Sequence, residues 1–494
     1  MKKLLFNIRN FYADKIRPII FFHKNKGIYK TSSLPATLLK QYCSKRYDIS
    51  NYSLCNAPFN SLFLGIDGYV IPCCFNRKMK LGSFNTQSIL DIWNGEKIAD
   101  FRNEFINFRF PDSCFQCKNH FMSGNFPAMG AERYDHIPVY KNQPAEIIFE
   151  LSDECNYRCI MCKGADSDWL AKLHENKSAS IDLPFLINQF DALLPGIYKT
   201  DFYGGEPFLI EEYYSIWGKI IEKNPKCIID VQTNGSILNE RVKQVLEKGR
   251  FRIGISLDSL NEETYSNIRR GGHLRIVLNN IEFFFQYTKR KNTHLYFAFC
   301  PITLNWKEIP EIIRFGNLHN ADVFFNTVME PHEISLYHLP CHLLKPIISQ
   351  LENEKISSGN YTELINKRNY NEFLHELKQW HQQKMKIKKM YREELEALEG
   401  IPINEILNDL KSKYQECSYI ANEQQNTNVL SHYYLVTEKL LDAYPHDIFL
   451  KKMLKKIIAM PHEKFVDFVR NKNMDELFIR SKKLYAEIKS SYEE

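Results

Sequence analysis

The sequence predicts an α/β fold built on a parallel sheet. Six short apolar runs occur between about residues 145 and 335, and helical stretches such as 237–248 and 276–288 separate them. Strands that alternate with helices favour a parallel sheet with right-handed crossovers. Polar and glycine-rich motifs follow several of these runs. In closed barrels of parallel strands, functional groups collect at the carboxyl ends of the strands. The predicted strands are 147–151, 200–203, 227–233, 251–258, 296–300 and 323–328.

The loop after the first strand carries three cysteines within eight residues. Cys155, Cys159 and Cys162 have the spacing C-x3-C-x2-C. A structural zinc site is closed by four protein ligands, and a cubane [4Fe–4S] cluster is normally held by four cysteines. Three thiolates therefore leave one metal position open for chemistry. The triplet alone is also compatible with a zinc site whose fourth ligand lies elsewhere in the chain.

The second strand runs directly into Gly204-Gly205-Glu206-Pro207. Two successive glycines let a ligand approach the backbone closely, and Glu206 offers a carboxylate beside them. The two motifs together resemble those of the radical S-adenosylmethionine (SAM) superfamily. The resemblance implies a partial (β/α)6 barrel in which the three cysteines hold a [4Fe–4S] cluster and the glycine motif, Pro207 included, lines the SAM site. Met161 stands where the family often has an aromatic residue near adenine.

Further candidates lie at or near other strand ends. Asn234 follows the third strand, and Ser256 and Asp258 end the fourth. The stretch 256–271 resembles the family's S-x-D…R-G segment, which implies that Ser256 and Arg270 help to hold the SAM carboxylate or ribose, because a guanidinium matches a carboxylate bidentately. The alternative is a structural ion pair between Asp258 and Arg270.

A second cysteine group precedes the barrel. Asp67-Gly68, between the apolar runs 62–64 and 69–71, predicts a β-hairpin that could bring two of these cysteines together. Four thiolates suit either a [4Fe–4S] cluster or a zinc ribbon. The predicted ligands are Cys55, Cys73, Cys114 and Cys117.

This segment resembles the SPASM/twitch domain, which binds auxiliary iron–sulfur clusters. C-x12-G-x4-C followed by C-x2-C carries the likeness. The domain usually follows the barrel, whereas here it precedes it, and its full pattern has seven cysteines for two clusters. The resemblance therefore implies one auxiliary [4Fe–4S] cluster. Cys74 could replace Cys73 as a ligand or remain a packed thiol, and a zinc ribbon remains an alternative.

Composition fits this interpretation. The chain has 494 residues, a net charge of +6 and thirteen cysteines. So small a net charge does not indicate binding to nucleic acid, and no apolar run is long enough to span a bilayer. Cysteines without a signal peptide favour metal sites over disulfides, so we expect the reducing cytoplasm.

Five segments are predicted. The last of them, residues 336–494, is helical. Its basic amphipathic stretch 448–458 is interpreted as a solvated helix face rather than a membrane or partner surface. The segments are an N-terminal extension (1–50), a SPASM/twitch-like domain (51–125), a linker (126–144), the radical SAM barrel (145–335) and a helical region (336–494).

The resemblance implies a reaction class. In the family, an electron delivered to the first cluster cleaves SAM to methionine and a 5′-deoxyadenosyl radical, which abstracts hydrogen from the substrate. We expect a reductase or a flavodoxin- or ferredoxin-type protein as the electron donor. A second cluster held by four thiolates has no open iron for substrate, which favours a role as electron acceptor and net oxidation of a peptide or protein.

Two alternatives stay open for the reaction, and one for the class of protein. A sugar or other small metabolite could be the substrate of an epimerase or dehydrogenase. Redox-neutral epimerisation needs a hydrogen donor, and Cys300 at the end of the fifth strand is the candidate, although a thiol packed as a small hydrophobe is the favoured interpretation of this residue. A non-enzymatic electron-transfer or metal-binding protein is the remaining alternative.

Overall fold

The computed structural model describes residues 34–46, 53–162, 181–420, 435–437, 439–441, 444, 447–461, 464 and 474–493. The chain divides into two compact units, which are Met1–Leu339 with Ile347–Leu377 (unit 1) and Pro340–Pro346 with Lys378–Glu494 (unit 2). Most of the predicted N-terminal extension lies outside the described residues. The predicted segment boundaries stay predictions.

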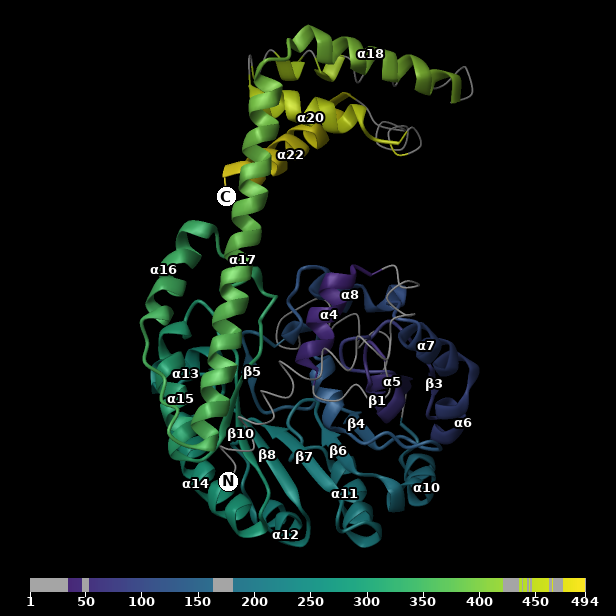
Figure 1. Ribbon diagram of the computed structural model, residues 1–494, viewed down its shortest axis with the longest axis vertical. Coiled ribbons are helices and arrows are strands. Elements are labelled where there is room, and N and C mark those ends of the chain that lie inside the picture. Colours follow the sequence, from purple (N-terminus) through teal and green to yellow (C-terminus); the bar gives the residue numbers. More distant parts are fainter. Residues whose placement is uncertain are drawn as a thin grey trace. The chain divides into compact units, whose positions relative to one another are not determined.

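Unit 1 is built on one nine-stranded sheet with the order β11-β10-β8-β7-β6-β4-β1-β2-β3 (Figure 1). The six predicted strands are all present, and each pairs with its neighbour in parallel. The predicted α/β class is therefore confirmed. Their bounds are β4 Glu146–Glu150, β6 Lys199–Phe202, β7 Ile228–Thr233, β8 Phe251–Ser256, β10 Leu295–Phe299 and β11 Asp322–Phe325.

Helices follow the strands and cover one face of the sheet. Aromatic side chains make this contact: Phe149 of β4 stacks on Phe202 of β6 with ring centroids 4.9 Å apart, and Trp217 meets Phe202 edge-on at 5.4 Å. Local signals fix where two helices begin, because Asn239 and Asn261 accept hydrogen bonds from backbone amides three residues on. The helices are α10 Leu183–Leu193, α11 Glu211–Lys223, α12 Glu240–Lys248, α13 Glu262–Ile268, α14 Leu274–Lys291 and α15 Ile309–Leu318.

The opposite face of the sheet is polar, because alternate residues along a strand point to opposite faces. Lys199 Nζ lies 2.7 Å from Asp201 Oδ1 and 3.3 Å from Glu146 Oε1. Burial raises the pKa of Asp201 to about 6, although Lys199 opposes the shift. Burial acts in the same direction on Glu146, but Lys199 and Arg133 outweigh it and lower the pKa of that carboxyl to about 2. This polar face of the sheet therefore carries a buried ionic network.

The predicted hairpin consists of β1 Ser61–Gly65 and β2 Tyr69–Ile71, and β3 Gly82–Ser83 pairs with β2. Gly68 takes φ 77° in the turn, a conformation that favours glycine. β1 also pairs in parallel with β4, so that Ser61 lies opposite Glu146 and its hydroxyl donates a hydrogen bond of 2.8 Å to that carboxylate. The cysteine-rich segment therefore extends the barrel sheet instead of forming a sheet of its own.

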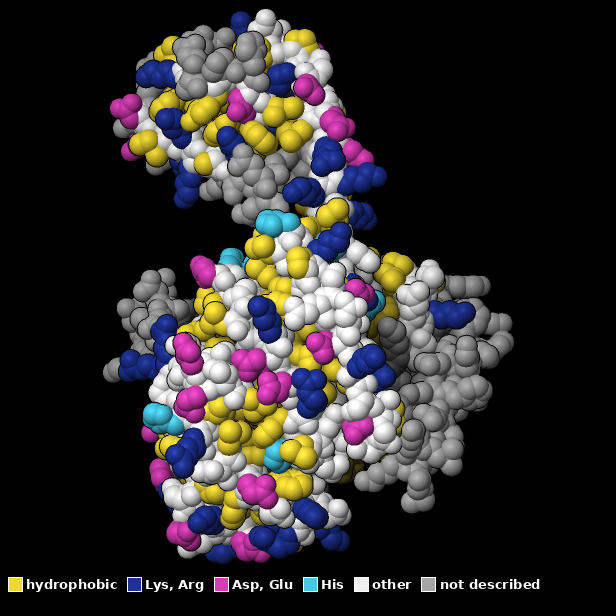
Figure 2. Space-filling view, turned by 90° about the vertical axis from the view of Figure 1, so that its left-hand side faces the viewer, with side chains coloured by type: hydrophobic (Ala, Val, Ile, Leu, Met, Phe, Trp, Pro, Cys, Tyr) yellow, Lys and Arg dark blue, Asp and Glu magenta, His cyan; other side chains and the backbone are white. Residues whose placement is uncertain are grey.

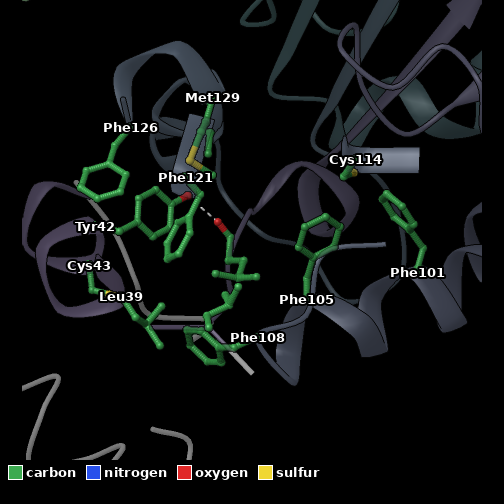
Figure 3. Packing of buried hydrophobic residues seen from close by; sticks show 13 residues of the cluster. Leu39, Tyr42, Cys43, Phe101, Phe105, Phe108, Cys114, Phe121, Phe126 and Met129 are labelled. Atoms are coloured by element: carbon green, nitrogen blue, oxygen red, sulfur yellow. Dashed lines mark hydrogen bonds between the residues drawn. The ribbon is translucent and has the colours of Figure 1, made fainter. Parts of the chain in front are cut away.

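Residues between Leu34 and Ala131 form a compact core that is rich in aromatic side chains (Figure 3). Tyr42 packs against Phe121 and Phe126, with centroids 5.5 and 5.3 Å apart, and its hydroxyl donates to Leu54 O. Cys114 belongs to the same cluster. The helices that supply this core are α4 Ala36–Lys45, α7 Glu96–Ile106 and α8 Phe115–Met122, and α5 Ala57–Asn60 and α6 Ile89–Asn94 lie between α4 and α7 in the chain.

The C-terminal region is helical, as predicted. Its helices are α16 Cys341–Glu352, α17 Tyr361–Glu399, α18 Ile403–Ile420, α20 Ile448–Ile458 and α22 Met474–Glu493. The apolar face of α20 is buried in the core of unit 2, and its lysines bind within that unit: Lys451 Nζ donates to Ile401 O at 2.8 Å, and Lys455 pairs with Asp409 at 2.9 Å. The basic face of α20 thus has intramolecular partners.

Charges of both signs are mixed with small hydrophobic areas over the face of unit 1 that Figure 2 draws, which lies at the left of Figure 1. Among the residues that the structure describes, no helix combines the length and apolar character that crossing a bilayer requires.

Candidate active site

The loop after β4 brings the three cysteines of the C-x3-C-x2-C motif together. Cys155 and Cys162 are exposed and Cys159 is partly buried. The loop is fixed by a short antiparallel pair, β5 Arg158–Cys159 with β9 Arg269–Arg270, in which Cys159 lies opposite Arg269. Ile160 N donates to Ile268 O at 2.9 Å. Burial raises the pKa of the Cys155 and Cys159 thiols, and the nearby Cys162 adds to both shifts.

Nitrogen donors are directed at two of these sulfurs. Tyr157 N lies 3.4 Å from Cys155 Sγ, and Asn234 Nδ2 lies 4.0 Å from the same atom. Arg269 Nη1 lies 3.8 Å from Cys159 Sγ. Such donors favour a charged thiolate, which is the form that ligates iron. The donor set of this loop therefore fits a [4Fe–4S] cluster with one open position.

Arg269 lies in the candidate site, although the sequence did not single it out. It is buried, and its Nη2 lies 2.6 Å from Asp258 Oδ2. The predicted ion pair of Asp258 is corrected accordingly, because the partner is Arg269 instead of Arg270. Neighbouring strand residues point to opposite sides, and here Arg270 is exposed. Asp258 Oδ1 also accepts from Cys300 N at 2.7 Å, and burial raises the pKa of Asp258 while Arg269 opposes the shift.

The two glycines after β6 pack against the backbone that leads into the cysteine loop. A Cβ on Gly205 would lie 1.9 Å from Glu154 O, and one on Gly204, whose φ is 120°, would lie 2.2 Å from Ser152 O. Gly205 N donates to Ser152 O at 3.0 Å. The glycines therefore permit close packing between their own backbone and the segment that leads into the cysteine loop. Their predicted contact with SAM stays a prediction.

Glu206 is fully buried and joins the ends of two strands. Its carboxylate accepts hydrogen bonds from Thr233 Oγ1 and Asn234 N, both at 2.7 Å, and from Phe208 N at 3.2 Å. Burial raises its pKa, and these donors oppose the shift. Pro207 O accepts from Ile210 N at the start of α11. Glu206 thus holds Asn234 beside Cys155, and its predicted contact with the SAM amino group stays a prediction.

The remaining candidates lie at the same end of the sheet. Ser256 Oγ accepts from Gln232 Nε2 at 3.4 Å. Met161 and Cys300 are partly buried in one apolar patch, and burial raises the pKa of the Cys300 thiol. The buried residues of this patch are Ile268, Ile302 and Val328. The patch therefore places Met161 and Cys300 together beside the cysteine loop.

A cavity in the cysteine-rich segment unites all four predicted auxiliary ligands. Its empty volume, open solvent included, is about 410 Å³, and its walls are mostly apolar. Cys73 lines this cavity. Cys74 is not among the described residues that line it, and its sulfur lies 3.9 Å from the Tyr134 hydroxyl. Burial raises the pKa of Cys55 to about 11 and that of Cys114 to about 12. The predicted ligands are Cys55, Cys73, Cys114 and Cys117.

This donor set fits an iron–sulfur cluster. Buried thiolates need a compensating positive charge, and a cluster held by four cysteines supplies one. Nowhere in the described ranges do three Cys, His, Asp or Glu side chains converge closely enough to chelate a single metal ion.

Two protein-family models match the chain. Residues 149–316 match the radical SAM superfamily, and residues 55–118 match SPASM, an iron–sulfur cluster-binding domain. Both matches fall where the cysteine motifs predict them, with the auxiliary domain before the barrel.

Curated relatives match the chain only in part. A GTP 3′,8-cyclase of Saccharophagus degradans is 30% identical over 149 residues, which cover 30% of this chain and 43% of the relative. A GTP 3′,8-cyclase of Clostridium perfringens is 36% identical over 133 residues, 27% of this chain and 40% of the relative. The chain spans less than half the length of these relatives.

Solved structures match this chain over stretches of different length. SuiB of Streptococcus suis bound to S-adenosylmethionine is 13% identical with a TM-score of 0.30, and the match covers 59% of this chain and 68% of that one. The radical S-adenosylmethionine methyltransferase TsrM of Kitasatospora setae is 13% identical with a TM-score of 0.30 and covers 37% and 36%.

Proposed function

We propose that this enzyme, whose chain carries a radical SAM domain and an N-terminal SPASM iron–sulfur domain, cleaves SAM reductively and oxidises a peptide or protein substrate. SAM bound at the first cluster supplies a 5′-deoxyadenosyl radical, which abstracts hydrogen from the substrate. The observation that carries the proposal is the cysteine loop, which is fixed at the carboxyl end of the sheet by Arg269 on one side and by the glycine motif on the other.

The residues around that loop have separate tasks. Cys155, Cys159 and Cys162 would hold the cluster. Asn234 directs an N–H group at the Cys155 sulfur, and Arg269 directs one at the Cys159 sulfur. Ser256 and Arg270 are proposed for the SAM carboxylate or ribose, because they lie at the same end of the sheet and a guanidinium suits a carboxylate. Next to the loop, the apolar patch around Met161 would exclude water from the reacting atoms.

The auxiliary domain favours net oxidation. Its four cysteines would fill the ligand positions of one cluster and leave no iron for substrate. A substrate that has lost a hydrogen atom must then lose one more electron, which a cluster held by these four cysteines would accept, and a proton to reach a closed-shell product. The first cluster needs an electron from a flavodoxin- or ferredoxin-type donor or a reductase, and oxygen-sensitive clusters call for a reducing compartment such as the cytoplasm.

A small-molecule substrate is the second candidate. The observation in its favour is the partial likeness of this chain to GTP 3′,8-cyclases. A redox-neutral outcome on such a substrate would require a hydrogen donor, for which Cys300 is the candidate because it shares the apolar patch with Met161.

The test is 5′-deoxyadenosine formation by the anaerobically reconstituted protein with SAM and a strong reductant. We expect product from the native chain and from a Cys341→Ala control, whose cysteine lies on α16 outside both sets, and none from Cys159→Ala. Product at equal rates from Cys159→Ala would contradict the proposal.

The substrate class is tested in the same assay. A peptide library should stimulate product formation above the level seen with SAM alone, and the modified peptide should be lighter by two hydrogens. Stimulation by GTP or a sugar in place of peptides would favour the second candidate.

A further inference from the structure

A buried asparagine connects two parts of the auxiliary cysteine cavity. Asn76 follows Cys73 in a tight turn, where its backbone N donates to Cys73 O at 3.1 Å. Its side chain crosses to the other cysteine pair, where Nδ2 lies 3.4 Å from Cys114 Sγ and 2.9 Å from Ser113 Oγ. Oδ1 accepts from Met79 N at 3.2 Å. Asn76 is 2% exposed.

These contacts fix the orientation of the amide. The oxygen is held by the Met79 amide, so the NH₂ group must point to Ser113 and Cys114. Ser113 has a hydroxyl that accepts one N–H, which leaves the other for the sulfur. The contact of 3.4 Å is within the range of an N–H···S hydrogen bond.

The surroundings make this contact strong. The cavity walls next to the sulfur are formed mainly by aromatic rings and other apolar groups, and a hydrogen bond in such a medium of low dielectric constant is stronger than in water. Hydrogen bonds to the sulfurs are among the features that set the reduction potential of iron–sulfur clusters. The aromatic residues of the wall are Phe75, Phe101, Phe105, Phe110 and Tyr134.

We propose that Asn76 sets the reduction potential of the auxiliary cluster through its hydrogen bond to Cys114. The inference rests on the proposed function, in which Cys114 is a cluster ligand. A donor N–H stabilises negative charge on the sulfur, and the reduced cluster carries one negative charge more than the oxidised cluster. Asn76 therefore raises the potential, which makes the cluster a better acceptor for the electron that the substrate radical must lose. Asn76 is a positioning residue, because it acts through Cys114.

The test measures the potential of the auxiliary cluster alone. The full-length chain with Cys155, Cys159 and Cys162 all changed to Ala is reconstituted anaerobically, and its remaining cluster is titrated with EPR detection of the reduced form. Asn76→Ala removes the donor, and Asn76→Leu removes it while keeping a similar side-chain volume and adding no charge. Asn125→Ala is the matched control, because Asn125 is a buried asparagine of the same cysteine-rich segment whose Nδ2 lies 3.4 Å from Glu376 Oε1 and which is not among the described residues that line the cavity.

We expect Asn76→Ala and Asn76→Leu each to reduce the ratio of reduced to oxidised cluster about tenfold at a fixed potential, which is a downward shift of about 59 mV for one electron. Asn125→Ala should keep the parent value. An unchanged potential in both Asn76 variants would overturn the assignment, and so would loss of the auxiliary iron from both, because Asn76 would then be structural only. A parent chain that holds no iron would instead refute the auxiliary cluster itself.

Discussion

Arg269 and Asp258 form a buried ion pair, with Nη2 2.6 Å from Oδ2, and the same guanidinium reaches to within 3.8 Å of Cys159 Sγ. The pair joins β9 to the end of β8, and Asp258 extends the connection to Cys300 N. One side-chain pair therefore links the cysteine loop to two neighbouring strands of the barrel.

Arg269→Met should destabilise the protein by about 3–5 kcal/mol, because removal of one partner leaves Asp258 buried without its counter-ion. Urea unfolding of the cluster-free chain measures the change. Arg158→Met on the paired strand β5 is the control, and as an exposed substitution it should cost about 0.5 kcal/mol or less. Equal costs for the two variants would mean that the ion pair has no special role.

Gly205→Ala should prevent cluster assembly at the cysteine loop. The added Cβ would lie 1.9 Å from Glu154 O, so the segment before Cys155 must move. Iron content and the visible absorbance of the reconstituted protein report the loss. Gly218→Ala on α11 is the matched control, since nothing lies within 4 Å of its Cβ and alanine in a helix is more stable than glycine by about 0.5–1 kcal/mol. A Gly205→Ala protein with full iron content would count against this account of the motif.

Cys73→Ala should remove the auxiliary cluster, whereas Cys74→Ala should keep it. Cys73 lines the cavity with the other three thiols, and Cys74 lies by the Tyr134 hydroxyl. We expect iron and sulfide to fall by about half in Cys73→Ala, because one of two similar clusters is lost. The reverse result would make Cys74 the ligand.

The stability of the cluster-free chain should depend on pH through Asp201. Its pKa in the folded protein is about 6, above the ordinary value near 4, because burial disfavours the carboxylate. The folded state therefore binds the proton more tightly, and the resulting stability is complete below pH 4 and lost as pH rises through 6. Relative to Asp201→Asn, the native chain should lose on the order of 2–3 kcal/mol between pH 4 and 7 in urea unfolding. A constant difference across this range would contradict the shift.

Lys451→Met should destabilise unit 2 by about 1–2 kcal/mol, because the ammonium group donates to the carbonyls of Leu398, Glu399 and Ile401 at the end of α17. Thermal unfolding followed by circular dichroism measures the effect. Lys456→Met, an exposed position of the same helix, should change the midpoint little. Similar losses in both variants would indicate a general effect of charge.

The sequence predicted the parallel strands and both cysteine groups because these are local signals. A run such as 147–151 is apolar whatever it packs on, and the spacing of Cys155 to Cys162 places three thiols in one loop. The hairpin at Asp67-Gly68 was predictable for the same reason, since a turn is specified by its own residues.

Long-range relationships were not predictable in this way. No local pattern indicates that Ser61 pairs with Glu146, 85 residues later in the chain. Arg269 and Arg270 are adjacent and chemically identical, so only the strand register decides which of them faces Asp258. Glu206 was expected to face a ligand, and its three buried hydrogen bonds depend on where β7 ends.

The pairing of β1 with β4 has a consequence for any attempt to separate the two cysteine sites. Removal of the residues before the barrel would turn β4 into an edge strand, with a row of unpaired N–H and C=O groups along Glu146–Glu150. Such an edge is a template for pairing with a second chain, so the isolated barrel should aggregate. The two cysteine sites are therefore built on one continuous sheet, which backbone hydrogen bonds between β1 and β4 hold together.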